Sequence, residues 1–440
     1  MKKIMVACLS AFAVLAAVAQ EQGSAAAAGA VKTEKKSAKV VNARSILRKE
    51  FEKYRKENNL PPYGAIDSRG RFYCTGEILV DANSSQVDFI DKRSIAYQKA
   101  YLDALANAVT NRVGHNMAEA VRNFSKDSSV INANEDPDKQ LPILQQKIEA
   151  LAEAEIDQKL RELNVDPKKF NANTIKQKRQ LYCDTYISEA VKEAFGSSVG
   201  CLPVQTFETN DGKGNYAVGV ILRFDISTID IAECVAQNKR PLLNRKDLAQ
   251  TVDKALPTEE QMITQFGVRL FFDESGTPTI LSFGQKGTTY TGTDAYEADM
   301  DMEASLRLAE AEANSQLTFF INSTLSFREV SKSGSSRIKE EYVKMDNSKE
   351  ERTLKNLIKK ISASTVIKGN AEMKGRSVVY KEVLNHPAGH NVAVVVVQYS
   401  FKTADEVDAI NSGVRPSDAK DETTAKPEDP GVRKGKSYDF

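Results

Sequence analysis

Two short glycine-bearing motifs in this sequence match patterns that carry chemistry in other proteins. Gly196–Gly200 fits the G-x-S-x-G pattern of a serine nucleophile, and Gly212–Ala217 fits the loosened dinucleotide pattern G-x-G-x-x-A. A nucleophile elbow needs a strand before the serine and a helix after it, whereas the order predicted here is helix and then strand. A dinucleotide fingerprint must open a helix, whereas the second motif opens the predicted strand Tyr216–Phe224. We therefore interpret the first motif as the glycine end of a helix and the second as a hairpin turn.

The histidines offer one spacing that metal sites use. His386 and His390 are four residues apart, which on a helix would direct two ligands toward one ion. Pro387 and Gly389 stand between them, so helical geometry is not expected there, and no further His or Cys lies nearby. We interpret both as turn residues, and His115, alone near a predicted helix end, as structural.

Two acidic stretches were weighed as calcium sites. Asn132–Pro137 mimics the start of a calcium loop, but a proline stands where the sharp-turn glycine belongs. Asp299, Asp301 and Glu303 alternate just before a long predicted helix, which favours stabilisation of the helix dipole, with calcium as the second hypothesis. The sequence thus predicts no catalytic residue, no cofactor and no metal ion.

Whether the cysteines form disulfides depends on the cellular compartment. Lys2 and Lys3 precede an apolar run, and Ala17–Ala19 supplies a signal peptidase site, so cleavage before Gln20 is expected. The run is too short to span a bilayer, which takes about 20 apolar residues. Cys8 lies within it, as an ordinary residue of the apolar region or, alternatively, a lipidation site. We therefore expect a periplasmic or secreted protein.

The remaining four cysteines, Cys74, Cys183, Cys201 and Cys234, are an even number in an oxidising compartment. Two disulfides are expected, with four buried free thiols as the alternative. A predicted helix separates Cys183 from Cys201 by roughly 18 Å, whereas a disulfide needs Cα atoms within about 7 Å. Cys74 and Cys201 both fall in predicted strands of one sheet. The favoured pairs are therefore Cys74–Cys201 and Cys183–Cys234.

An internal repeat organises the chain. At one constant offset Gly76 falls on Gly284, Ala96 on Ala304 and Lys99 on Arg307. The same offset superposes two apolar helical stripes, Tyr101, Leu105, Val109 and Val113 on Ala309, Ala313, Leu317 and Ile321. Turns at Asp67–Gly70 and Asp273–Gly276 predict a hairpin before each helix. A second helix and a second hairpin follow in both copies.

The repeat predicts an α+β fold of two modules, each an antiparallel sheet built from two hairpins with helices packed on one face. The expected divisions are a signal peptide at 1–19, a flexible linker at 20–44, module 1 at 45–234 with a helical insertion at about 130–180, a helical connector at 235–262, module 2 at 263–402 and a disordered tail at 403–440.

The pattern resembles known envelope proteins. An Ala-rich helix after a Gly-bearing strand, then a second helix and closing strands, spans Phe72–Val113 with Tyr186–Phe224 and recurs later in the chain. It resembles the lipoprotein-20-like envelope family and the amino-terminal domain of flagellar assembly protein T. Gly267–Gln285 is similar to uncharacterised secreted bacterial proteins with a domain of unknown function. The resemblance implies an envelope-associated interaction or assembly domain without catalysis.

Composition narrows the function further. The chain has 61 basic and 60 acidic residues, which argues against a dedicated nucleic-acid binder. We expect a non-enzymatic protein that binds another envelope or secreted protein. A carbohydrate- or peptidoglycan-binding module is the alternative, weakened because the chain has no tryptophan to stack on sugars. An enzyme is the third hypothesis.

Overall fold

The computed structural model of the chain describes residues 42–124, 136–346, 353–366 and 373–411. The first part forms α2 (Ala43–Glu57), β1 (Phe72–Asn83), α3 (Phe89–Phe124), α4 (Pro137–Glu149), α5 (Glu153–Glu162), η2 (Pro167–Phe170), α6 (Ile175–Ser197), β2 (Cys201–Asn210), β3 (Asn215–Phe224) and α7 (Ile226–Ala236). The second part forms η3 (Lys246–Leu248), α8 (Val252–Ala255), α9 (Glu259–Met262), β4 (Gly267–Phe272), β5 (Pro278–Gly287), α10 (Ala295–Ser333), α11 (Ser335–Asp346), α12 (Leu354–Val366), β6 (Arg376–Asn385), β7 (Asn391–Tyr399) and α13 (Phe401–Asn411).

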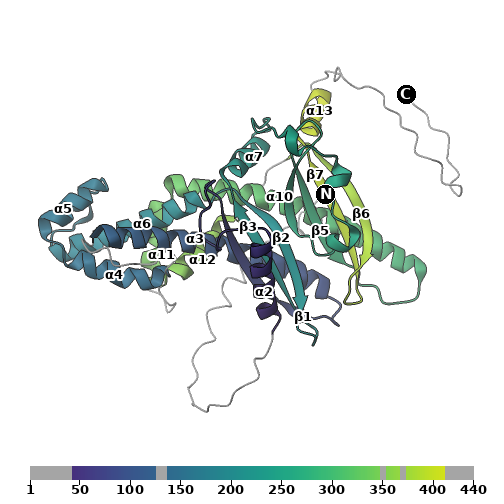
Figure 1. Ribbon diagram of the computed structural model, residues 1–440, viewed down its shortest axis with the longest axis horizontal. Helices are drawn as coiled ribbons and strands as arrows, with labels where there is room; N and C mark the ends of the chain where they lie inside the picture. The colour runs from purple at the N-terminus through teal and green to yellow at the C-terminus, as the bar shows by residue number, and fades with distance from the viewer. Residues whose placement is uncertain (1–41, 125–135, 347–352, 367–372, 412–440) are drawn as a thin grey trace, which may run out of the picture.

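Two antiparallel sheets lie side by side, one from each copy of the repeat (Figure 1). The first has the strand order β1-β3-β2 and the second the order β4-β5-β7-β6. The long helix α3 packs on β1 and β3, and α10 packs on β5 and β7. The α+β class and the two modules are therefore confirmed.

Helices cover both faces of the first sheet, so the expectation of one covered face is wrong for module 1. Leu47 and Phe51 of α2 pack with Ala217 and Ile221 on the face opposite α3. Alternate residues of a strand point to opposite faces, so β3, with a buried side chain at nearly every position, fills both interfaces.

The first hairpin of module 1 is reduced to its turn. Asp67 and Asp273 each close a turn by accepting two backbone N–H groups at Oδ1. In module 2 the full strand β4 precedes that turn, whereas in module 1 only the bridge between Ile66 and Phe72 remains. Prolines 61 and 62 come just before it, and a residue without an N–H cannot extend a ladder. The predicted four-strand sheet therefore has three strands in module 1.

A glycine lets strand and helix touch in both modules. A Cβ on Gly76 would lie 1.9 Å from the carbonyl oxygen of Ala100, and a Cβ on Gly284 would lie 1.9 Å from that of Ala309. The two alanines are therefore equivalent, one residue away from the alignment that placed Tyr101 on Ala309. The loop from strand to helix is one residue longer in module 2, which a constant offset cannot represent.

The repeat continues past the closing strands. Gly200 and Gly375 both adopt positive φ, and their carbonyl oxygens accept from the N–H groups of Asp225 (3.3 Å) and Ser400 (3.0 Å). Each of these contacts precedes a helix, α7 in module 1 and α13 in module 2. The expected disordered tail is therefore wrong for residues 403–411, which are helical.

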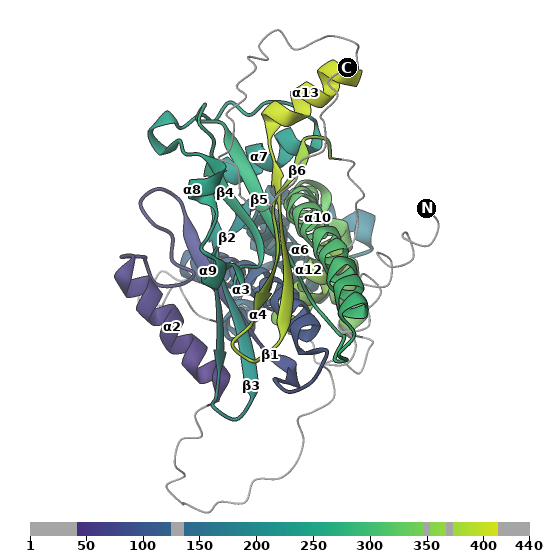
Figure 2. The ribbon, with the colours of Figure 1, turned by 90° about the vertical axis from the view of Figure 1, so that its right-hand side faces the viewer.

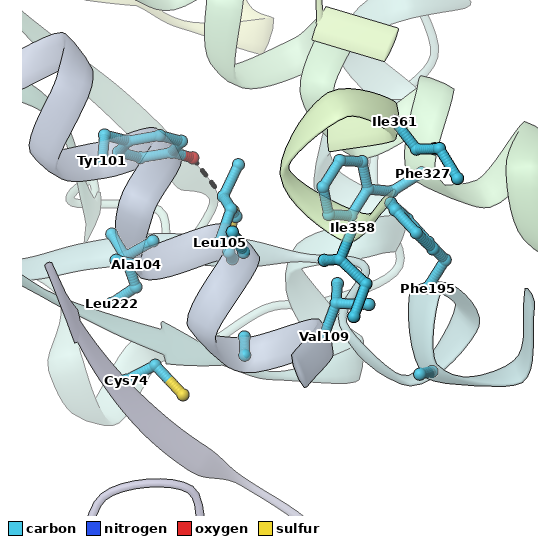
Figure 3. Close-up of a cluster of buried hydrophobic side chains, with 14 of the residues drawn as sticks. Cys74, Tyr101, Ala104, Leu105, Val109, Phe195, Leu222, Phe327, Ile358 and Ile361 are labelled. Carbon is cyan, nitrogen blue, oxygen red and sulfur yellow. Dashed lines mark hydrogen bonds between the residues drawn. The ribbon is translucent and has the colours of Figure 1, made fainter. Parts of the chain in front are cut away.

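Helices of the two modules share one core. Figure 3 shows Phe327 of α10 and Ile358 of α12 beside Phe195 of α6 and Val109 of α3. The rings of Phe195 and Phe327 meet edge to face, with centroids 4.9 Å apart. Because each module supplies part of the other's packing, the two copies form one hydrophobic unit.

Within the predicted helical insertion lie α4, α5 and η2, at the far end of the helical layer (Figure 1). Its apolar stripe includes Leu144, Ile148, Ile156 and Leu160, all buried. Asp138 of α4 accepts from the backbone N–H of Leu354 in α12 at 2.6 Å, so the insertion also contacts module 2.

Besides the tail, the boundary of the predicted linker differs from the expected one. The side chain of Asn42 accepts from the N–H of Ser45 and starts α2 inside the predicted linker. In the predicted helical connector 235–262 lie the short helices η3, α8 and α9. The predicted signal peptide, residues 20–41 and residues 412–440 lie outside the described residues. Among the described residues, no helix has the length and apolar character needed to cross a bilayer.

Candidate functional site

The glycine motifs adopt the local structures that the sequence predicts. Gly196–Gly200 lies at the end of α6 and leads into β2, and Gly212–Ala217 covers the turn between β2 and β3 and the first residues of β3. His386 and His390 close the β6–β7 turn, where the N–H of His386 donates to the carbonyl oxygen of His390 at 2.8 Å. His115 lies within α3.

The acidic stretches serve local structure. Asp136 accepts from the N–H of Asp138 at the start of α4, while residues 132–135 lie outside the described residues. Asp301 accepts from the N–H groups of Thr289 and Tyr290, and so ties α10 to the preceding loop. Within the described ranges, no group of three or more His, Cys, Asp or Glu side chains can hold a metal ion.

The described cysteines form no disulfide, so the expected pairs Cys74–Cys201 and Cys183–Cys234 are absent. Cys74 and Cys201 do lie in one sheet, but β3 runs between their strands, which places them about two strand spacings, or ~10 Å, apart. The hydroxyl of Tyr101 lies 2.9 Å from Cys201 Sγ. Burial raises the pKa of both Cys74 and Cys201 to about 12, so these thiols are poor nucleophiles.

A buried polar cluster joins the modules. Arg93 of α3 and Glu208 of β2 form an ion pair, with Nε 2.6 Å from Oε2 and exposed side-chain fractions of 0% and 4%. The other oxygen of Glu208 accepts from Nε2 of His386, in the second module, at 2.9 Å. A carboxylate of module 1 is thus held between an arginine of its own module and a histidine of the other.

Further contacts of Arg93 come from module 2. Its Nη2 donates to the carbonyl oxygen of Ile263 and, at 3.1 Å, to Oε1 of Gln285. Its guanidinium lies over the ring of Phe266, 5.0 Å from the centroid. These contacts stabilise the charge of an arginine that has left water completely.

The β6–β7 turn reaches module 1 through both histidines. The N–H of Ala388 donates to Nδ1 of His386 at 3.0 Å, so Nε2 carries the proton that His386 donates to Glu208. His390 donates from Nε2 to the carbonyl oxygen of Ser84 at 2.6 Å. The interpretation as turn residues is confirmed, and the structure adds that both residues fasten the modules together.

Charge in the cluster is set by opposing effects. Burial disfavours ionisation of Glu208, but Arg93 and the hydrogen bond from His386 outweigh it and hold the pKa of Glu208 below its ordinary value. Burial also lowers the pKa of Arg93, and Glu208 opposes that change. The cluster is therefore an ionised pair closed off from solvent, suited to fixing the modules and not to binding a substrate. Sequence reasoning missed Arg93 and Glu208, because each is one charged residue among many.

An open groove lies beside β1. It encloses about 430 Å³ between α2 and α3 and is lined by Arg48 and Phe51 of α2, Glu77 of β1, and Asp103 and Asn107 of α3. Arg48 pairs with Glu77 at 2.5 Å, and the side chain of Arg48 is 70% exposed. The groove therefore offers one arginine and three carboxylates, those of Glu52, Glu77 and Asp103, beside the rings of Phe51 and Tyr63.

Side chains cap the edge of β1 within the groove. Nδ2 of Asn107 donates to the carbonyl oxygen of Thr75 at 3.0 Å, and Nη2 of Arg44 donates to that of Glu77 at 3.3 Å. Caps of this kind protect an edge strand from pairing with a further strand. The groove is consequently better suited to a helix than to an added strand.

The same position in module 2 is filled. Gly76 and Gly284 are equivalent, so Glu77 of β1 corresponds to Gln285 of β5. In the helices, Asp103 of α3 corresponds to Glu312 of α10. In module 2 these equivalents are bound by α3: Gln285 by Arg93 at 3.1 Å, and Glu312 by Gln98 at 3.0 Å. The groove of module 1 is thus the unfilled counterpart of the place where α3 docks on module 2.

Comparisons with known proteins show a shared fold without a known activity. Residues 142–237 match a domain of unknown function, DUF6844, which covers less than half of the chain and lies outside Gly267–Gln285, where such a likeness was expected. The crystal structure of hypothetical protein FTT1539c from Francisella tularensis is similar, with a TM-score of 0.52 and 19% sequence identity, over 88% of this chain and 97% of that one. That likeness supports the fold alone. A search of curated proteins found no match.

Proposed function

We propose that the chain is exported to the cell envelope or secreted, and acts there as a protein-interaction or assembly module without catalysis. The observation that carries this proposal is the groove beside β1. Its counterpart in module 2 holds a helix, whereas in module 1 the groove of about 430 Å³ holds none among the described elements. A surface built to receive a helix and left open is typical of an interaction site.

Two further features support the proposal. The residues best suited to acid–base chemistry, Glu208 and His386, are buried and engaged with each other. The N-terminal sequence has the pattern of a signal peptide, and the resemblance to lipoprotein-20-like proteins and flagellar assembly protein T favours a role in the envelope.

Site-specific photo-crosslinking in the producing cell tests the interaction. A photoreactive phenylalanine analogue replaces Leu79, which lies on β1 beyond Glu77 and is 43% exposed, and a control replaces Leu242 in the connector, which is fully exposed. We expect a discrete crosslinked species from position 79 and none from position 242. Equal crosslinking at both positions, or none at either, contradicts the proposal.

Export has its own readout. Mass spectrometry of the protein from the periplasmic or culture fraction is expected to find Gln20 at the amino terminus, without lipid. A chain that keeps residues 1–19 and stays in the cytoplasm contradicts the localisation, whatever the crosslinking shows.

A further inference from the structure

The start of α10 extends beyond the sheet on which the rest of the helix packs. The hydroxyl of Ser305 donates to the carbonyl oxygen of Gly287, the last residue of β5, at 3.2 Å. Residues 295–304, about 15 Å of helix, therefore lie past the end of that strand (Figure 1). Figure 2 shows α10 at the outside of the molecule, on the side of the sheets away from α2. The first turns of α10 are thus accessible to another molecule.

The outward face of these turns is apolar. Tyr296 is 74% exposed, Met300 is 54% exposed and Leu308 is 47% exposed, and with the exposed Ala304 they recur every four residues. Residues at this spacing form one row along a helix, which we call the α10 stripe. Leu306, on the opposite face, is half-buried and packs on the apolar cluster between α10 and β7. The stripe therefore points away from the protein's own core.

The α10 stripe is particular to module 2. By the equivalence of the two alanines that face the strand glycines, Met300 corresponds to Asp91 of α3, and Leu308 corresponds to Lys99. Module 1 thus has charged residues at two positions where module 2 exposes methionine and leucine. Because neighbouring exposed apolar side chains are typical of an interaction surface, the stripe indicates a contact that module 1 does not make in this way.

Acidic side chains border the stripe. Residues 294–308 include five acidic side chains and one basic side chain, that of Arg307. Arg307 is 76% exposed and lies 3.9 Å from Glu303, so it neutralises little of this charge. The exposed acidic side chains beside the stripe are those of Glu297, Asp299 and Glu303. A basic partner is therefore attracted to the stripe, whereas a second copy of the same acidic helix is repelled.

The spacing of the stripe also indicates the shape of its partner. Side chains four residues apart form a ridge along a helix, and such ridges pack between the ridges of a second helix. The small side chain of Ala304, between Met300 and Leu308, lets another helix approach closely at that point. Amphipathic helices bind surfaces through apolar residues about one turn apart. The stripe thus fits a helix.

We propose that the α10 stripe is a second interaction surface, which binds an amphipathic helix of another protein whose apolar face is bordered by lysine or arginine. The inference goes beyond the groove beside β1, because the stripe lies on module 2 and the groove on module 1. With both surfaces occupied, one chain joins two partners.

Fluorescence anisotropy of labelled peptides, titrated with the full chain, tests the proposal. The first peptide, of about 18 residues, has leucine along one helical face and lysine on the remaining surface, and the second has glutamate in place of each lysine. We expect the lysine peptide to bind with a dissociation constant of about 100 μM or lower at low salt, and the glutamate peptide to bind at least ~10-fold more weakly. Added salt is expected to weaken binding of the lysine peptide.

Variants locate the binding on α10. Met300→Asp with Leu308→Lys introduces the residues that module 1 has at these positions, and is expected to weaken binding of the lysine peptide at least ~10-fold, because charges enter an apolar contact. Ile410→Asp is the matched control, since Ile410 is 69% exposed on α13, which also carries acidic residues, and it leaves binding unchanged.

A charge reversal tests the part played by the acidic border. Asp299→Lys with Glu303→Lys is expected to reverse the preference, so that the glutamate peptide binds more tightly than the lysine peptide. Circular dichroism of each variant confirms that it is folded.

The outcomes separate this surface from the groove beside β1. Absence of binding by the lysine peptide, equal binding of the two peptides, or wild-type affinity in Met300→Asp with Leu308→Lys overturns the proposal. If the wild type self-associates in sedimentation velocity and that double variant does not, the stripe binds a second copy and the basic partner is wrong. None of these results depends on position 79, so the groove is judged by its own crosslinking.

Discussion

Glu208→Gln is the sharpest perturbation of the contact between the modules. The substitution keeps the shape of the side chain and one oxygen to accept from His386, but removes the negative charge beside Arg93. The arginine side chain is fully buried, so it cannot turn into solvent to recover hydration. The variant therefore isolates the cost of an uncompensated buried charge.

The size of the expected destabilisation follows from the burial of both Arg93 and Glu208. Removing one member of a buried ion pair costs about 3–5 kcal/mol, and we expect a loss in this range from the free energy of unfolding. Adding Arg93→Met removes the stranded charge, so the double variant is expected to recover up to about 3 kcal/mol relative to the sum of the single changes.

Urea unfolding at neutral pH, followed by far-ultraviolet circular dichroism, measures these changes. Arg48→Met is the matched control, because it removes an arginine from the ion pair with Glu77 at a site that is 70% exposed. We expect the control to cost about 1 kcal/mol or less. If Glu208→Gln destabilises the protein no more than this control, the buried pair does not hold the modules together and the reasoning is refuted.

Three further outcomes follow. The pKa of Glu208 is lowered in the folded state, so its ionised carboxylate stabilises the folded protein fully above about pH 4.3, the ordinary pKa of glutamate. This stabilisation is lost as the pH falls through the pKa of Glu208 in the folded state. The urea midpoints of wild type and Glu208→Gln should therefore converge as the pH is lowered to that value. Gly76→Ala should cost about 3 kcal/mol or more because its Cβ meets helix backbone, whereas Gly70→Ala, with open space around it, should cost about 1 kcal/mol from its positive φ alone; equal losses by urea unfolding contradict this. Timed alkylation should label partly exposed Cys234 well before buried Cys201, and equal labelling rates in the native protein contradict this order.

Local pattern determined much of the fold. Turn residues and strict periodicity are properties of neighbouring residues, so the turn at Asp67 and the amphipathic insertion around Leu144 could both be predicted. Because the sequence is duplicated, each helix and strand is indicated twice, once in each copy. The α+β class and the two modules can therefore be predicted from the sequence.

Pairing between distant residues could not be read in this way. The sequence correctly predicts that Cys74 and Cys201 lie in one sheet. Whether two residues of a sheet are in contact depends on the strand order, and here β3 lies between their strands. The helix α13 was missed because its residues are largely polar, so little in their pattern distinguishes them from the tail that follows.

The sequence by itself determined the repeat, the α+β class and the absence of a recognisable catalytic motif, because these depend on residues close together in the chain. Only the tertiary structure decided which surfaces of the repeat meet. Arg93 and Glu208 are separated along the chain by the rest of α3, the helical insertion and α6, and His386 lies in the other module, yet packing brings all three together. Two similar units folded into one core cannot both use every surface, and that asymmetry leaves the groove beside β1 open.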